Sequence, residues 1–278
     1  MYRNRLPDSL PGVFPTSCDM SSSDLLAAPL RGVDSVVHLV WHDDPISSKQ
    51  VAPVWDYTTQ EQDLPLNIRF TLNLIHAMEV SRTRRIVFLS REGASEKSEV
   101  QSLREKYLCE FFILNSKIPE KIIIRAPLAF SQGEICDRFY HSVLRTMRVP
   151  GIYPVPEAKK AMSLIHVDDI AKILAKACQL DMREPNAVLS LPSGESLQLG
   201  EIFKLAARKT GKPYKIPIRG FLGYVILSLL ERKAHLMSNI PPLSQFLLLN
   251  SEKDTPQKMD PLLKEISPGK FTSLRDVL

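Results

Sequence analysis

The chain has 278 residues, of which 44% are hydrophobic and 24% are charged, and its formal net charge is +5 at pH 7. This length is enough to bury a substantial core, and the composition excludes a disordered or fibrous chain. The basic residues are scattered along the sequence, so we expect no nucleic-acid partner. The first residues lack an apolar core, which argues against a signal peptide.

The four cysteines, Cys18, Cys109, Cys136 and Cys178, are far apart and form no Cys-x-x-Cys pair. This pattern argues against a zinc site or a disulfide framework and fits a reducing compartment, so we expect a cytoplasmic protein. The most apolar run, residues 221–230, is about half as long as a membrane-spanning helix. We expect a buried helix there and no transmembrane segment; the alternative is a helix that faces a membrane surface or a partner protein.

Short apolar runs rich in β-formers alternate with helical patterns, which predicts a parallel sheet with crossover helices. The predicted strands are residues 33–40, 85–90, 121–125 and 163–166, and the predicted helices are residues 66–79, 102–115, 134–149 and 168–179. From residue 187 to 217 the pattern is strand, turn, helix and strand, with Gly211 as the predicted C-cap of that helix.

Six segments coincide in order and spacing with the motifs of one enzyme family. Residues 30–41 resemble "GvD-VvHla", residues 67–77 "NvxGTxnllxA", residues 85–90 a strand that ends in a cofactor-facing serine, residues 122–133 "ilRpxxxyG", residues 163–171 "xxihVdDva", and residues 190–213 the family's tail lobe. Phe70 departs from this pattern, because glycine is usual at its position. The chain resembles the atypical and extended short-chain dehydrogenase/reductases, the NAD-dependent epimerase/dehydratase family, and within it the NmrA-like branch.

The resemblance implies an α/β fold: a Rossmann-like parallel sheet, N-terminally truncated here, with a small mixed C-terminal lobe. Residues 1–135 would form the truncated NAD(P)-binding domain, and residues 136–278 a lobe for substrate or partner. Residues 31–41 would then be the fourth strand of a dinucleotide-binding sheet. Such a sheet holds the cofactor's pyrophosphate on a Gly-x-x-Gly-x-x-Gly turn, and no three of the eleven glycines fit that spacing. We therefore expect binding of NADP or NAD to be weak or lost.

The same resemblance implies which residues contact the cofactor. Arg3 would meet the 2′-phosphate of NADP, and Asp19 and Met20 would contact the adenine. The other cofactor-binding candidates are Leu39, Val40, Ser90, Arg125 and Pro127. Two alternatives stay open: Arg3 as a terminal charge, and Asp19 or Ser21 as a helix N-cap.

The family's catalytic Tyr-x-x-x-Lys pair is incomplete in this chain. Lys106 fits the lysine position, because Glu110 follows it at the spacing of "SKxxxE". An i, i+4 pair shares one helix face, yet Ser102 stands where the tyrosine belongs, and Glu92 replaces the catalytic serine. A serine hydroxyl is a much weaker acid than a phenol, so we expect weak or no redox activity, with Lys106 and Ser102 as the remaining catalytic candidates. The alternative is that Lys106 is a solvated helix charge paired with Glu110.

Two groups of metal-ligand residue types are also present, His38 with His42 and His166 with Asp168 and Asp169. Strand residues four apart are about 13 Å apart, too far to share one ion. We expect no metal site, with His38 in the core and the aspartates at the start of a helix.

The leading functional hypothesis is an atypical short-chain dehydrogenase/reductase-like, NAD(P)-binding protein for a small-molecule substrate that the sequence does not identify. One alternative is a non-catalytic NmrA-like regulator or an assembly or accessory protein; another is a complete reductase whose start has been mis-assigned. Strand 33–40 would have an unpaired edge, so we also expect self-association or a protein partner.

Overall fold

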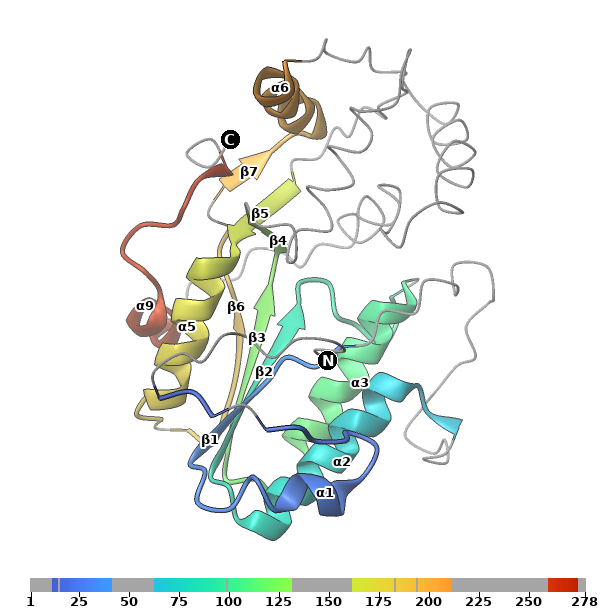
Figure 1. Cartoon of the computed structure of the whole chain (residues 1–278). Coiled ribbons are helices and arrows are strands. Elements are labelled where there is room, and N and C mark those ends of the chain that lie inside the picture. The colour runs from blue at the N-terminus through green and yellow to red at the C-terminus, as the bar shows by residue number, and fades with distance from the viewer. Residues whose placement is uncertain are drawn as a thin grey trace.

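The structure, a computed structural model, describes residues 12–14, 16–41, 63–98, 100–131, 162–182, 184–193, 195–211 and 260–274. Two sheets are built from these residues (Figure 1): a four-stranded sheet in the order β1-β2-β3-β6 and a three-stranded sheet in the order β4-β5-β7. Arg3, the predicted helix 134–149 and the apolar run 221–230 lie outside the described residues.

The first sheet is parallel throughout and confirms the predicted fold class. Its strands are β1 (Ser35–His38), β2 (Arg85–Arg91), β3 (Glu120–Ala126) and β6 (Asn186–Ser190). The run Ile122–Ile124 in β3 is fully buried, as expected for a parallel strand that is covered on both faces.

Helices cover both faces of this sheet (Figure 1). Alternate strand residues such as Ile86 and Phe88 pack against α2 (Leu66–Ser81) and α3 (Gln101–Leu114). Their neighbour Val87 faces the other way, toward α5 (Val167–Gln179) and α9 (Pro261–Ile266). The two resulting cores hold the strands in place, so that their carboxyl ends meet at one edge of the sheet.

The second sheet is mixed. Strand β4 (Leu128–Phe130) runs parallel to β5 (Met162–His166), and β7 (Glu195–Leu197) runs antiparallel to β5. Helix α6 (Leu199–Thr210) follows and ends at Gly211, whose φ of +64° confirms the predicted C-cap. A short helix, α1 (Ser23–Ala27), packs against α2.

The predicted elements that fall on described residues agree with the structure to within about two residues at each end. Strand β6 lies beyond the expected domain boundary near residue 135, yet it pairs with β3 in the first sheet. The division of the chain into two domains therefore stays a prediction. Within the described part of the chain, β1 pairs with β2 alone, and no helix is long and apolar enough to cross a membrane.

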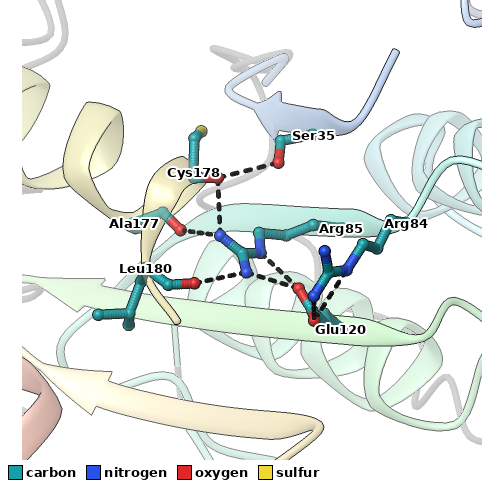
Figure 2. Close-up of polar contacts among 7 residues, drawn as sticks. All are labelled: Ser35, Arg84, Arg85, Glu120, Ala177, Cys178 and Leu180. Atoms are coloured by element: carbon teal, nitrogen blue, oxygen red, sulfur yellow. Dashed lines mark hydrogen bonds and ion pairs between the residues drawn. The ribbon is translucent and has the colours of Figure 1, made fainter. Parts of the chain in front are cut away.

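A buried arginine at the amino end of β2, Arg85, links β2 to β3 and to the end of α5. Figure 2 shows the guanidinium of Arg85 between Glu120 and the last carbonyls of α5. It donates hydrogen bonds to the carbonyls of Ala177, Cys178 and Leu180 at 2.6–3.0 Å. Burial alone would raise the pKa of Glu120, but hydrogen bonds from its arginine neighbours lower it below the ordinary value. This cluster neutralises the negative end of the α5 dipole.

Candidate functional site

Five polar side chains gather where β2 and β3 end. We call Ser90, Arg91, Lys106, Glu110 and Arg125 the strand-end cluster. Three of these residues lie on β2 or β3, and Lys106 and Glu110 reach them from α3. Ligands of open parallel sheets bind outside the carboxyl ends of the strands, so this is where the fold places a site.

Glu110 is the centre of the cluster. Its buried carboxylate accepts hydrogen bonds from Arg125, with 2.7 Å between Oε2 and Nη2 and 3.1 Å between Oε1 and Nε. The hydroxyl of Ser90 donates to the same carboxylate. Sequence reasoning missed this triad, because it used Glu110 only as a possible partner of Lys106.

Lys106 contacts β2 and Trp41 and makes no ion pair with Glu110 within the described residues. Its ammonium donates to the carbonyl oxygen of Leu89 at 2.9 Å and lies 3.8 Å from the centre of the Trp41 ring. Burial, with the positive charge of Arg91 as a smaller cause, lowers the pKa of Lys106 to about 8. Lys106 is therefore not a solvated charge paired with Glu110. No pattern in the sequence predicts its contact with Trp41.

His38 is a core residue, as predicted. It is 2% exposed, stacks on Phe88 and has Nε2 3.0 Å from the hydroxyl oxygen of Thr71. The Thr71 hydroxyl donates to the carbonyl of Asn67, so Nε2 of His38 carries the proton. Burial, with Lys106 as a minor cause, lowers the pKa of His38 to about 3, which keeps the ring neutral.

The acidic and thiol groups beside Lys106 are also buried. The carboxylate of Glu105 accepts hydrogen bonds from the amides of Asn67 and Gln101, both at 2.8 Å. Burial raises the pKa of the Cys109 thiol to about 12, so that this thiol stays protonated. Cys18, Cys109 and Cys178 are free cysteines, and Cys136 lies outside the described residues.

The remaining candidates have separate contacts. Ser102 is one turn before Lys106 on α3 and is partly exposed. Asp19 accepts a hydrogen bond from the backbone N–H of Ser21, which lowers its pKa, and it does not cap α1, whose N-cap is Ser22. The backbone carbonyl of Met20 accepts from Asn73.

Three other candidates follow the strands directly. Leu39 and Val40 continue the chain after β1, and Pro127 separates β3 from β4. Leu39 is 56% exposed, whereas Ser90 is buried.

The described residues fit a nicotinamide dinucleotide poorly. Two of the candidates with strong hydrogen-bonding groups, Ser90 and Arg125, use those groups on Glu110. Lys106 uses one donor on Leu89 and lies against Trp41. The polar groups that would orient a cofactor are therefore largely bonded within the fold.

The other predicted group, at the start of α5, is structural. His166 is the N-cap of α5, and its Nδ1 accepts from the N–H of Asp168. The buried carboxylate of Asp169 accepts from the N–H of Thr272, which ties the segment after α9 to α5. Within the described ranges no group of three or more His, Cys, Asp or Glu residues could hold a metal ion.

No protein-family model matches the sequence, and no curated protein matches it significantly. Solved structures do match. The triphenylmethane reductase of Citrobacter sp., complexed with NADP(H), is 15% identical with a TM-score of 0.65. An NADPH-dependent quinone oxidoreductase from Escherichia coli, complexed with NADPH, is 13% identical with a TM-score of 0.63. A nucleoside-diphosphate-sugar epimerase from Staphylococcus aureus is 14% identical with a TM-score of 0.63.

Each of these three matches covers 93% of this chain and 80% of the other chain. Matches at such low identity establish the fold alone. The matches agree with the parallel sheet β1-β2-β3-β6 and the mixed second sheet of this chain. The chain therefore has the Rossmann-type α/β fold of these solved structures.

Proposed function

We propose that this chain is an atypical short-chain dehydrogenase/reductase-like protein whose redox activity is weak or absent. The observation that supports this proposal is that Ser102 stands one turn before Lys106 on α3. The family resemblance assigns the acid–base tyrosine to the position of Ser102, and Lys106 four residues later donates a hydrogen bond to the carbonyl of Leu89. A serine hydroxyl at this place is too weak an acid to supply the proton of a carbonyl reduction at neutral pH.

The proposal includes feeble binding of NADP or NAD. Two observations support it: the sequence has no Gly-x-x-Gly-x-x-Gly turn, and the hydroxyl of Ser90 and the guanidinium of Arg125 are used by Glu110. Without an anion cradle the pyrophosphate would lose its main hydrogen bonds. The cofactor would then be held mainly by apolar contacts and by single groups such as Asp19.

Isothermal titration of the purified chain with NADPH, and separately with NADH, tests this proposal. We expect dissociation constants well above the low micromolar range for both nucleotides, with no large difference between them. A dissociation constant in the low micromolar range or tighter would contradict feeble binding.

A role as a non-catalytic regulator or accessory protein is the second candidate. It is favoured by the edge of β1, which pairs only with β2 in the described part of the chain, and by the exposed side chain of Leu39 just beyond it. An open strand edge beside an exposed apolar residue is a surface that another polypeptide can cover. Such a role would require no chemistry at Lys106.

A further inference from the structure

The segment that follows α9 runs from the helices on the first sheet to the second sheet. We call residues 267–274 the strap. In Figure 1 this red segment rises from α9 past α5 to β7. Helix α9 itself is well anchored, because Leu263 and Ile266 are buried in the core that α5 shares with the first sheet. The strap therefore begins at a fixed point.

Two carboxylates hold the far half of the strap. Asp169, in the first turn of α5, accepts a hydrogen bond from the backbone N–H of Thr272 at 2.7 Å. Glu195 on β7 accepts from the backbone N–H of Leu274 and from the hydroxyl of Ser273, both at 2.9 Å. The two carboxylates belong to different parts of the fold, since α5 covers the first sheet and β7 lies in the second. Three consecutive residues of the strap thus connect β7 to α5.

The near half of the strap is held less well. Ser267 has a buried hydroxyl oxygen that meets no hydrogen-bond partner in the described part of the chain, which costs free energy. Lys270 is exposed, and a side chain at Gly269 would meet nothing within 4 Å. Apolar burial returns only at Phe271, which packs on the core beside α5, and at Leu274, which is 3% exposed. Closure of the strap therefore depends strongly on the hydrogen bonds to the two carboxylates.

The strand that the strap holds lies at the ligand-binding end of the fold. The second sheet is joined to the carboxyl ends of the first, because β4 follows β3 after Pro127 and β7 follows β6 after a short connection. Parallel α/β sheets bind ligands at these ends. Among the described residues β7 pairs with β5 alone, over three residue pairs. A contact outside the sheet therefore matters for the position of β7.

We propose that the strap is a conformational switch with a closed and an open state. The closed strap holds β7 on α5, whereas the open strap leaves α9 in place and frees β7 beside the ligand-binding end of the first sheet. A segment with few buried contacts opens at a lower free energy than the central strands, and it opens as a unit. The switch needs no nicotinamide nucleotide, since the contacts that close it lie within the chain.

Native-state hydrogen exchange of the full chain measures this opening. The N–H groups of Thr272 and Leu274 make the closing hydrogen bonds, so their exchange with solvent reports the open state directly. We expect these two amides to exchange at the same protection level, about tenfold or more faster than the buried amides of β3. The amides of β7 should lose protection whenever the strap is opened by substitution.

Charge at Ser273 tests the contact that closes the strap. Ser273→Glu should speed exchange in the strap and in β7 about tenfold or more, because it replaces a donor to Glu195 with a second carboxylate. Adding Glu195→Gln should restore much of the protection, since the repulsion is removed and an acceptor oxygen is kept. Lys270→Glu is the control: it adds negative charge at an exposed position of the same strap and should leave exchange unchanged. If Ser273→Glu does not fold by circular dichroism, Ser273→Ala replaces it and should give a smaller increase.

A change in the opposite direction is expected at the start of the strap. Ser267→Ala should slow exchange of the Thr272 and Leu274 amides, because it removes the buried hydroxyl that has no partner. Three results would overturn the proposal: strap amides as protected as those of β3, an effect of the Ser273 variant on the strap but not on β7, or equal effects of Ser273→Glu and Lys270→Glu.

Discussion

Glu110 on α3 and Arg125 on β3 form an ion pair with 2.7 Å between Oε2 and Nη2, and the glutamate side chain is only 3% exposed. The pair joins a helix that covers one face of the sheet to the strand beneath it. A buried charge that loses its partner is strongly destabilising, whereas removal of both charges together costs much less. The pair therefore fixes how α3 sits on the sheet, and it orients Ser90 as well.

Breaking this pair should destabilise the fold. We expect Glu110→Gln and Arg125→Met each to lower the free energy of unfolding by about 3 kcal/mol, because each leaves its partner buried and unpaired. The double variant Glu110→Met/Arg125→Met should cost less than the sum of the single variants. Urea unfolding measures all three. Additive losses would show that the two side chains act independently.

Two adjacent arginines provide a matched comparison at the other end of the sheet. Arg84 and Arg85 both bind Glu120, but their side chains are 65% and 6% exposed. Arg85→Gln should cost about 3 kcal/mol, because three carbonyls at the end of α5 lose their donor (Figure 2). Arg84→Gln should cost less than about 1 kcal/mol, as expected for an exposed pair. Equal losses in urea unfolding would contradict this assignment.

His38 should make stability depend on pH. The pKa of His38 is about 3 in the fold, below the ordinary 6.5. Its contribution to the free energy of unfolding is therefore complete above pH 6.5 and is lost as the pH falls toward 3. Between pH 7 and pH 5 this loss amounts to about 2 kcal/mol.

Urea unfolding at these two pH values, in the wild type and in His38→Gln, isolates the effect. The variant should lose less stability on acidification than the wild type does. His76→Gln is the control, because His76 is exposed on α2, and it should behave as the wild type. An unchanged pH dependence in His38→Gln would exclude His38 as the cause.

Much of the fold could be predicted because apolar runs mark its strands. Ile122–Ile124 identify β3 as buried on both faces, and Gly211 marks the end of α6 through a backbone conformation that glycine favours. The start of α5 was less clear, since the sequence points to Asp168 whereas His166 is the N-cap.

The polar contacts of the site could not be predicted in the same way. On α3, Glu105, Cys109 and Glu110 are buried, although a pattern of apolar residues assigns carboxylates to the solvent face. Their partners come from elsewhere in the sequence: Asn67 on α2 binds Glu105, and Arg125 on β3 binds Glu110. Such pairings depend on how helices and strands pack, which local spacing does not encode.

Self-association should occur through the edge of β1. Within the described residues β1 pairs with β2 alone, and Leu39 next to it is 56% exposed. Sedimentation over a range of concentrations should show a mass that rises above that of one chain. Leu39→Lys should reduce the association, because a charge at a strand edge discourages pairing. Val80→Lys, at an exposed position on α2, is the control. A monomer at every concentration would contradict this prediction.

Restoring the missing phenol should not restore catalysis. In Ser102→Tyr the new hydroxyl would stand one turn before Lys106, whose ammonium is held by the Leu89 carbonyl at 2.9 Å and by Trp41. A competent acid–base pair raises rates by about a hundredfold or more, whereas we expect less than about a twofold change in NADPH oxidation with a panel of ketones and sugar nucleotides. Ser102→Phe is the control, since it adds the ring without the hydroxyl. A large gain in Ser102→Tyr that Ser102→Phe lacks would show that Lys106 is a dormant catalytic residue, and the proposal of lost redox chemistry would then fail.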